Sequence, residues 1–300
     1  PIRDAFKKFL LGYRIALETG DIEFGMINIF LYLYFLFASG NPLGIVKRDY
    51  CFYLEELSHK HSSSPIFLQT NFISTVDQLM VLPATSENSK LPLPRSNALD
   101  FNAPMIIILS IVNGDYQEAV DVGRLFFKQF PIEIFDYVSY YMLVGVANIA
   151  LYKQTGKTRK YLIIAGQYYK KQIMRFCKSA MEYCLSKLTL LEAELSSVLQ
   201  HDHSKTVQKF ANTISLADSK NNIFESAFVR ERYARYLLSV GDHTSALTFF
   251  QSSCRLYNEW NAYGKVALLE EEINDLASSL SSDVFQNNSD TVNQGSSSTS

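Results

Sequence analysis

The tripeptide Gly156-Lys157-Thr158 matches the last positions of a phosphate-binding loop, in which backbone N–H groups and the lysine hold the phosphates of a nucleotide. The complete loop needs another glycine five residues before Gly156, where this sequence has Leu151. Such a loop also starts at the end of a buried strand, and no buried strand precedes this one. The sequence therefore predicts no nucleotide site here, and we expect no cofactor to bind within this chain.

Two His-x-His pairs have the residue types of a metal site. They are His59/His61 and His201/His203, and each lies in or beside a polar loop with no nearby cysteine and no clear third ligand. Surface histidines are therefore the favoured interpretation. No serine or cysteine stands in a recognisable nucleophile elbow, so the sequence predicts no catalytic residue and no metal site.

The composition excludes some classes of partner. A formal net charge of −2 gives no electrostatic reason to expect nucleic acid or an acidic membrane surface. The basic stretch YYKKQIMR at 168–175 is interpreted as the solvated face of a helix. The four cysteines match no zinc spacing and no signal peptide is visible, which favours buried thiols in the reducing cytoplasm: Cys51, Cys177, Cys184 and Cys254.

A repeated Gly-Asp phrase predicts how the chain is organised. A small residue follows the glycine by five positions, and the phrase occurs three times: Gly20/Gly25, Gly114/Ala119 and Gly241/Ala246. A glycine can take the left-handed conformation that ends a helix, and an aspartate is well suited to cap the next helix. The small residue then lies one turn inside the second helix and lets the two helices approach closely. This is the logic of a tetratricopeptide hairpin.

Apolar residues that recur at intervals of three and four extend the helical pattern after Pro131. Residues 200–217 are interpreted as a decayed copy, with Asp202 at the turn and Thr206 at the small position. In 225–257 the charged residues are expected mainly on the outer face: Glu225, Arg230, Glu231 and Arg235. No run alternates at period two, so the sequence predicts an all-α, irregular tetratricopeptide-like α-solenoid of helical hairpins.

Composition divides the chain into four parts. We predict an N-terminal helical subdomain over 1–82, a long loop over 83–104, and helical repeats over 105–280. The Ser/Asn-rich residues 281–300 are predicted to be a disordered linker. Because the sequence opens on a proline and ends in a serine-rich tail, we expect it to be part of a longer polypeptide.

Two apolar stretches, 24–46 and 137–152, raise the question of a membrane span. Asn28 interrupts the first stretch, and Gly40-Asn41-Pro42 stops its helix after about 15 residues, fewer than the roughly 20 that cross a bilayer. The sequence therefore predicts buried helices within the solenoid at both places, and no contact with a membrane.

A heptad pattern lies near the C-terminal end, at Val266, Leu269, Ile273, Leu276 and Leu280. It covers about two heptads, fewer than the three or four that are typical of a coiled coil. A helix that packs on the last repeat of its own chain is therefore favoured over a helix at a dimer interface, since a terminal repeat must cover its own core. The pattern leaves the oligomeric state open.

Three stretches resemble a known family: GYRIALETGDIEFGMINIFLYLYFLFASGNPL (12–43), YCLSKLTLLEAELSSVL (183–199) and YNEWNAYGKVALLEEE (257–272). They are similar to the helical-repeat segment of very large signalling proteins. Those proteins join a protein-kinase-like domain, a STAND-type AAA ATPase, tetratricopeptide-like helices, a GAF sensor and an output module. The output is often a histidine kinase and sometimes a nucleotide cyclase. The resemblance runs over most of residues 3–275.

The family's motifs appear here with two changes. Residues 185–194 read Leu-x-Lys-x-x-Leu-x-Glu-Ala-Glu and resemble the corresponding stretch of the family, but Ser186 stands where the family commonly has histidine. The last stretch keeps Trp260, followed by Asn261 in place of glycine; asparagine is the best other residue for a left-handed helix end. These motifs are structural, so the resemblance transfers no active site.

The resemblance implies a function for the segment. We expect a non-catalytic, regulatory helical scaffold within a larger cytoplasmic signalling ATPase or kinase, with ATP bound elsewhere in the parent protein. Its expected partners are the neighbouring ATPase and the GAF or output domains of the same chain, and other proteins on the concave face of the solenoid.

The alternative is a self-contained helical enzyme or small-ligand-binding domain. Its pocket would be lined by the tyrosines and phenylalanines of 29–37 and 137–152. Such a site needs polar or titratable groups that converge on the pocket, and both stretches are poor in them. An open pocket that holds an unpaired carboxylate or histidine would favour this alternative.

Overall fold

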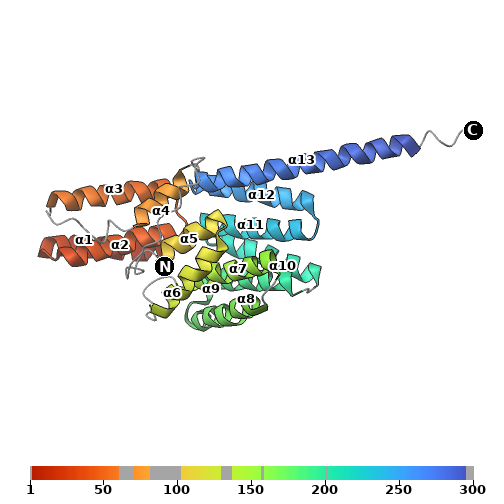
Figure 1. Cartoon of the computed structure of the whole chain (residues 1–300). Helices are drawn as coiled ribbons and strands as arrows, with labels where there is room; N and C mark the ends of the chain where they lie inside the picture. Colours follow the sequence, from red (N-terminus) through yellow and green to blue (C-terminus); the bar gives the residue numbers. More distant parts are fainter. Residues whose placement is uncertain are drawn as a thin grey trace, which may run out of the picture.

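All regular secondary structure in the described residues is helical (Figure 1). The computed structural model describes residues 2–60, 71–81, 103–129, 137–156, 159–199 and 202–294. Neighbouring helices pack as hairpins, which confirms the predicted all-α solenoid. The elements are α1 (Ile2–Thr19), α2 (Ile22–Ala38), α3 (Leu43–Lys60), α4 (Asn71–Met80), α5 (Ala103–Asn113), α6 (Tyr116–Gln129), α7 (Tyr137–Thr155), α8 (Arg159–Ile163), the π-helix η1 (Ile164–Tyr169), α9 (Lys170–Val198), α10 (His203–Asp218), α11 (Ile223–Ser239), α12 (His243–Glu259) and α13 (Tyr263–Gln294).

The Gly-Asp turns have the geometry that the sequence predicts. All three glycines take positive φ angles, of 77°, 77° and 85°: Gly20, Gly114 and Gly241. At the last turn, the Asp242 carboxylate accepts a hydrogen bond of 3.0 Å from the Ser245 backbone N–H and caps α12. The small residue Ala246 has no exposed surface. In the decayed copy, Asp202 caps α10 and Thr206 is buried, as predicted.

Asparagine makes two further turns of the same kind. Asn261 has a φ of 68° at the end of α12, as expected for a residue that replaces glycine there. Asn221 has a φ of 53°, and the Asn222 side chain accepts a hydrogen bond of 2.9 Å from the Glu225 N–H to cap α11. The Asn221-Asn222 turn is absent from the sequence-based predictions because it lacks the Gly-Asp signal.

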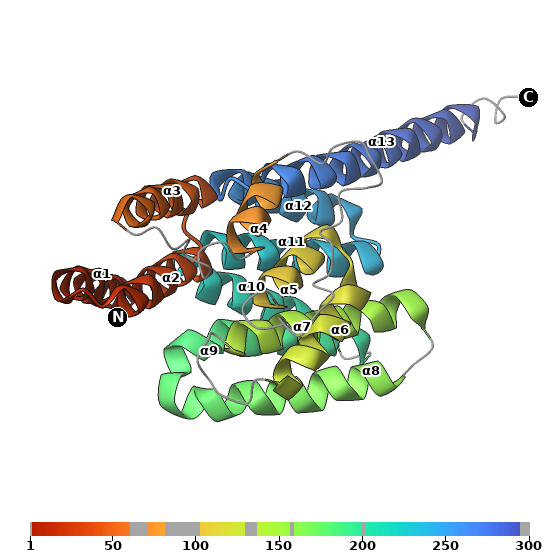
Figure 2. The ribbon, with the colours of Figure 1, turned by 60° about the vertical axis from the view of Figure 1, so that its left-hand side comes forward.

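The helical segment α9 bends back on itself and adds one more hairpin (Figure 2). Lys170 Nζ lies 2.7 Å from Glu192 Oε1, whereas residues this far apart in a straight helix would be separated by about 33 Å. Gly166 in η1 likewise faces the end of α9, since a Cβ at Gly166 would lie 2.8 Å from Leu195 Cδ2. Both pairs place the reversal near residue 181. The first arm therefore contains α8, η1 and the start of α9, and the second arm contains the rest of α9.

The N-terminal helices pack on the C-terminal end of the array (Figures 1 and 2). At the turn between α2 and α3, the Leu43 N–H donates to the Trp260 carbonyl over 2.9 Å. At the same turn, Asn222 Nδ2 donates to the Ala38 carbonyl over 3.1 Å. α4 approaches α13 so closely that a Cβ at Gly264 would lie 2.7 Å from a carbonyl oxygen at the end of α4. Backbone contacts therefore join segments that are far apart in the sequence.

One hydrophobic core runs through both of the predicted helical parts, 1–82 and 105–280. Side chains of α2, α3 and α4 belong to the same buried cluster as those of α5 to α7 and α9 to α13. Most of the predicted loop 83–104 lies outside the described residues, and α5 already begins at Ala103. The two helical parts therefore share their core instead of folding around separate ones.

The two apolar stretches form the buried helices that the sequence predicts. α2 ends at Ala38, just before the predicted stop at Gly40-Asn41-Pro42. Inside α2, Asn28 donates from Nδ2 to the Phe24 carbonyl over 2.8 Å, which satisfies a buried amide. α7 is buried along most of its length. Among the described helices, none is long and apolar enough to cross a membrane.

The cysteines are buried only in part. Cys177 and Cys184 are buried, as predicted, and Cys254 is half-buried. Cys51 is exposed, so the expectation of a buried thiol is wrong there. Its position on α3 is followed by Phe52, which is itself 60% exposed, so this side of α3 faces away from the core.

The heptad stripe of α13 is covered from within the chain. Leu269 has no exposed surface, and three more positions pack against the core: Val266, Ile273 and Leu276. α12 and α4 supply the covering surface. The first part of α13 is therefore a cap on the last hairpin, as the sequence favours.

Beyond this cap, α13 continues to Gln294 and extends away from the body (Figure 1). This differs from the disordered linker predicted from residue 281, and residues 295–300 lie outside the described ones. No glycine or proline interrupts residues 265–294. A helix that already exists is extended more easily than a new one is nucleated, which accounts for the difference.

Candidate functional site

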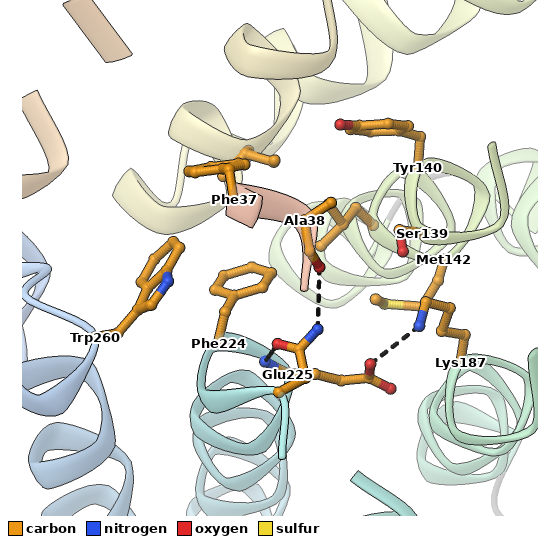
Figure 3. Close-up of a pocket in the computed structure, with 12 residues that line it drawn as sticks. Phe37, Ala38, Ser139, Tyr140, Met142, Lys187, Phe224, Glu225 and Trp260 are labelled. Atoms are coloured by element: carbon orange, nitrogen blue, oxygen red, sulfur yellow. Dashed lines mark hydrogen bonds and ion pairs between the residues drawn. The ribbon is translucent and has the colours of Figure 1, made fainter. Parts of the chain in front are cut away.

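A cavity lies where the end of α2 meets α5, α7, α9, α11 and the end of α12 (Figure 3). Its lining is largely apolar and aromatic: Phe37, Ile108, Tyr140, Met142, Leu143, Phe224 and Trp260. The volume open to the centres of water molecules is about 30 Å³, which holds roughly two or three waters. A benzene-sized guest needs a cavity of roughly 150 Å³, so this one admits water and little else.

Glu225 of α11 supplies a carboxylate to this cavity, and cations and a hydroxyl hold it in place. Its Oε2 accepts from Lys187 Nζ over 3.0 Å, and its Oε1 accepts from the Ser186 hydroxyl. Lys220 Nζ donates in turn to Ser186 Oγ and to the Tyr183 carbonyl. Burial alone would raise the pKa of Glu225, but the charges of Lys187 and Lys220 and these hydrogen bonds outweigh it and lower that pKa. Glu225 is therefore ionised and paired at neutral pH.

Trp260 lies across the cavity from Lys187 (Figure 3) and is 1% exposed. Its ring packs on Phe224 and Phe37, with centroid distances of 4.7 and 5.8 Å. Its indole Nε1 has no hydrogen-bond partner among the described residues. A water molecule in the cavity is the natural acceptor for such a donor.

This geometry bears on the alternative of a ligand-binding pocket. The carboxylate at the cavity is paired, and no histidine is among the lining residues. The aromatic residues of α2 and α7 pack on one another, with the hydroxyls of Tyr34 and Tyr140 2.7 Å apart. This cavity therefore lacks the features that would favour an enzyme or a small-ligand-binding domain.

A second buried carboxylate, Glu231 of α11, holds α13 on α11. Lys265 of α13 donates from Nζ to Glu231 Oε1 over 2.8 Å, and both side chains are 4% exposed. Tyr257 of α12 donates its hydroxyl to Glu231 Oε2 over 3.0 Å. Arg235 bridges Glu231 and Glu272 of α13, at 2.9 and 3.0 Å. Burial alone would raise the pKa of Glu231, but Lys265 and Arg235 outweigh it and lower that pKa to about 2.

A third buried carboxylate, Glu194 in the second arm of α9, joins α11 to α7. Arg232 of α11 donates from Nε to Glu194 Oε1, and Lys153 of α7 donates to Glu194 Oε2 over 3.0 Å. Arg232 also donates to the Tyr116 hydroxyl of α6 over 3.1 Å. Glu194 is fully buried and Arg232 nearly so. Burial alone would raise the pKa of Glu194, but the charges of Arg232 and Lys153 outweigh it and lower that pKa to about 2.

Glu231 and Arg232 are consecutive residues of α11. They link the contacts around Glu231 to those around Glu194. Neighbouring residues of a helix point about 100° apart, so two sides of α11 are engaged at one level. One side holds α12 and α13, and the other holds α9 and, through Glu194, α7. These contacts form what we call the ionic path: Lys265, Glu231, Arg232, Glu194 and Lys153.

The residues that could have carried chemistry are not brought together in the described part of the chain. Leu151 is buried in α7, and Gly156 follows the end of that helix at a φ of 60°. His203 Nδ1 lies 2.8 Å from the Tyr236 hydroxyl, and no group of three potential metal ligands occurs in the residues that can be placed. His59 lies in α3. The remaining ones lie outside the described residues: Lys157, Thr158, His61 and His201.

The buried charges are what the sequence-based predictions miss. Glu225 and Glu231 are expected on the outer face of 225–257, and this expectation is wrong, since each is 4% exposed. Each carboxylate faces a helix from outside its own hairpin, which local periodicity does not detect. A signal is nevertheless present in the Leu-x-Lys…Glu-Ala-Glu pattern, whose Lys187 and Glu194 are both buried.

Acid is expected to remove the stability that Glu194 contributes. Its pKa is near 4.5 in the unfolded chain and about 2 in the folded one, so the contribution is complete above pH 4.5 and is lost as the pH falls toward 2. A Glu194→Gln variant cannot ionise. The wild type should therefore exceed this variant in free energy of unfolding at neutral pH, and the gap should close between pH 4.5 and 2. Urea denaturation at a series of pH values measures this difference in free energy of unfolding. A difference that stays constant down to pH 2 would contradict the low pKa of Glu194.

The motifs that carry the family resemblance have structural roles here. Ser186 donates to Glu225, Asn261 ends α12, and Trp260 fills the junction beside the cavity. These residues hold helices together and present no reactive group. No family model matches the chain, and no curated protein matches it closely enough to count as a relative.

Proposed function

We propose that this chain is a non-catalytic, regulatory and protein-interacting helical scaffold within a larger cytoplasmic signalling ATPase or kinase. The proposal is supported by the hairpin fold, by the pairing of the buried carboxylates, and by the three stretches that resemble the family. ATP would bind elsewhere in the parent protein. The partners would be its ATPase and its GAF or output domains, with other proteins on the concave face of the solenoid.

The observation that carries the proposal is the ionic path from α13 to α7. α13 projects from the body, so a displacement of its free end acts on its anchored end (Figure 1). That end holds Lys265, which is buried against Glu231. Pulling a buried pair apart leaves a charge unpaired, at a cost of about 3–5 kcal/mol. A displaced α13 therefore favours a movement of α11 with it, which suits a segment that passes a change of state between neighbouring domains.

Hydrogen exchange tests this coupling in a Lys265→Met variant. Glu231 keeps Arg235 and the Tyr257 hydroxyl as partners, so the variant is expected to fold. If the ionic path couples the helices, amide exchange should become faster in α11 and also in the second arm of α9, where Glu194 meets Arg232. Exchange measured by mass spectrometry on the whole chain resolves these segments.

A matched control is Arg255→Met, which removes an exposed cation of α12 outside the ionic path. It should leave exchange in α11 and α9 as in the wild type. If Lys265→Met accelerates exchange in α12 and α13 alone, the helices are not coupled along the ionic path, and the relay proposal is wrong.

A further inference from the structure

The first arm of the α9 hairpin carries an exposed face that is both basic and apolar. Three exposed cations of α9 follow one another at intervals of four and three residues, which places them on one side of the helix. Met174 lies between them and is 50% exposed. We call this surface the basic face: Lys171, Met174, Arg175 and Lys178.

Among the residues that the structure describes, the cations of the basic face form no ion pair. The adjacent Lys170, by contrast, pairs with Glu192. Arg175 donates to the neutral Gln172 side chain over 3.2 Å. Met174 adds an exposed apolar side chain among these cations, which the sequence-based interpretation of 168–175 as a solvated face does not include. Met is a side chain that adapts to a partner's surface.

A surface of α13 carries the opposite charge to the basic face. Glu271 and Asp275 are exposed, and Leu268 beside them is half-buried. Glu271 and Asp275 are four residues apart, the same spacing as Lys171 and Arg175. We call this surface the acidic face: Leu268, Glu271 and Asp275.

The two faces cannot meet within one molecule. α13 lies on one side of the body and the first arm of α9 on the other, in both views (Figures 1 and 2). α13 projects from the body, so its exposed side is accessible to another molecule. Complementary charge on opposite sides of one chain points to contact between copies.

We propose that the acidic face of α13 docks on the basic face of a second copy of this chain. The two carboxylates would meet the three cations, and Leu268 would cover Met174. Because the two surfaces differ, the contact is head-to-tail, and each copy keeps one free face on which a further copy can dock. This inference does not depend on the proposed function, since it concerns surfaces outside the ionic path.

The contact is expected to be weak and sensitive to salt. Two short helix faces bury less than the roughly 1,200 Å² of a stable interface, and exposed ion pairs contribute about 0–1 kcal/mol each. The Debye length falls from about 30 Å at 0.01 M salt to about 8 Å at 0.15 M, so self-association should weaken over that range. Sedimentation of the wild type over a range of concentrations, at both salt levels, measures this.

Charge reversal identifies the surfaces. The variant Lys171→Glu/Arg175→Glu/Lys178→Glu has two acidic faces, and Glu271→Lys/Asp275→Lys has two basic ones. All five positions are exposed, so both variants should fold, which circular dichroism checks. Each variant alone should sediment as a monomer at low salt. A mixture of the two should associate again, because each then offers the face that the other lacks.

The control for net charge is Lys7→Glu/Lys8→Glu/Arg14→Glu, whose three positions are exposed on α1. It changes the net charge as much as the first reversal but leaves both faces intact, so it should self-associate like the wild type. A wild type that stays monomeric at low salt overturns the proposal. So does self-association that survives either reversal, or a basic face that binds anionic phospholipid vesicles while the wild type stays monomeric.

Discussion

Replacing Gly40 with alanine is expected to lower the free energy of unfolding by about 2–5 kcal/mol, from a strained backbone and an overpacked contact together. Gly40 has a φ of 73°, a region that residues with a Cβ rarely adopt. A Cβ there would overlap the Asn222 side chain and lie 2.8 Å from the Ile223 backbone nitrogen. Asn222 cannot move away freely, because its amide holds the Ala38 carbonyl and its oxygen caps α11.

Gly241→Ala is the matched control. Gly241 has a φ of 85°, but a Cβ there would have no neighbour within 4 Å, so the substitution adds backbone strain alone. The expected loss is about 1–2 kcal/mol. Urea denaturation of the wild type and both variants gives the comparison. Equal losses at the two positions would show that the turn between α2 and α3 does not rest on the cap of α11.

The difference between Gly40 and Gly241 shows which structural roles can be predicted from the sequence. A Gly-Asp pair with a small residue five positions later is a local signal, because the turn, the cap and the close approach all involve neighbouring residues. The hairpins around Gly20, Gly114 and Gly241 could therefore be predicted. The role of Gly40 could not, because the atom that excludes a side chain there belongs to Asn222, on a helix distant in sequence.

The ionic path could not be predicted from the sequence either, because its partner residues lie on helices that are distant in sequence. Periodicity places a charged residue on the face opposite its own hairpin's core, but a solenoid packs a third helix onto that face. Glu231 meets Lys265 of α13, and Glu194 meets Arg232 of α11. The expectation that no nucleotide or metal motif is complete is of another kind, because such motifs are judged by spacing within one local stretch of sequence.

Glu194→Leu is expected to lower the free energy of unfolding by about 3–5 kcal/mol, because it leaves Arg232 buried without its carboxylate. A guanidinium cannot lose its proton inside a protein, so the charge cannot be removed by titration. Arg232→Met should cost less. The Glu194 carboxylate then keeps Lys153 as a counter-ion, at 3.0 Å, and it can also take up a proton.

The matched control is Asp218→Ala, which removes the carboxylate partner of Arg230, two residues before Arg232 on α11. Asp218 is 45% exposed and Arg230 can turn to water, so the expected loss is about 0–1 kcal/mol. Urea denaturation at neutral pH ranks the three variants. A loss for Glu194→Leu no larger than that for Asp218→Ala would mean that water reaches Arg232.

The double variant Glu194→Leu/Arg232→Met gives the sharpest expectation, since the second substitution should restore stability that the first removes. With both charges gone, the site holds two apolar side chains, and replacing a buried pair in this way is often close to neutral. Lys153 is left without its carboxylate, but its side chain is 28% exposed and can reach water. The double variant should therefore be more stable than Glu194→Leu alone. If the two losses simply add, the charges do not act on each other, and α9 and α11 are held together by apolar packing instead.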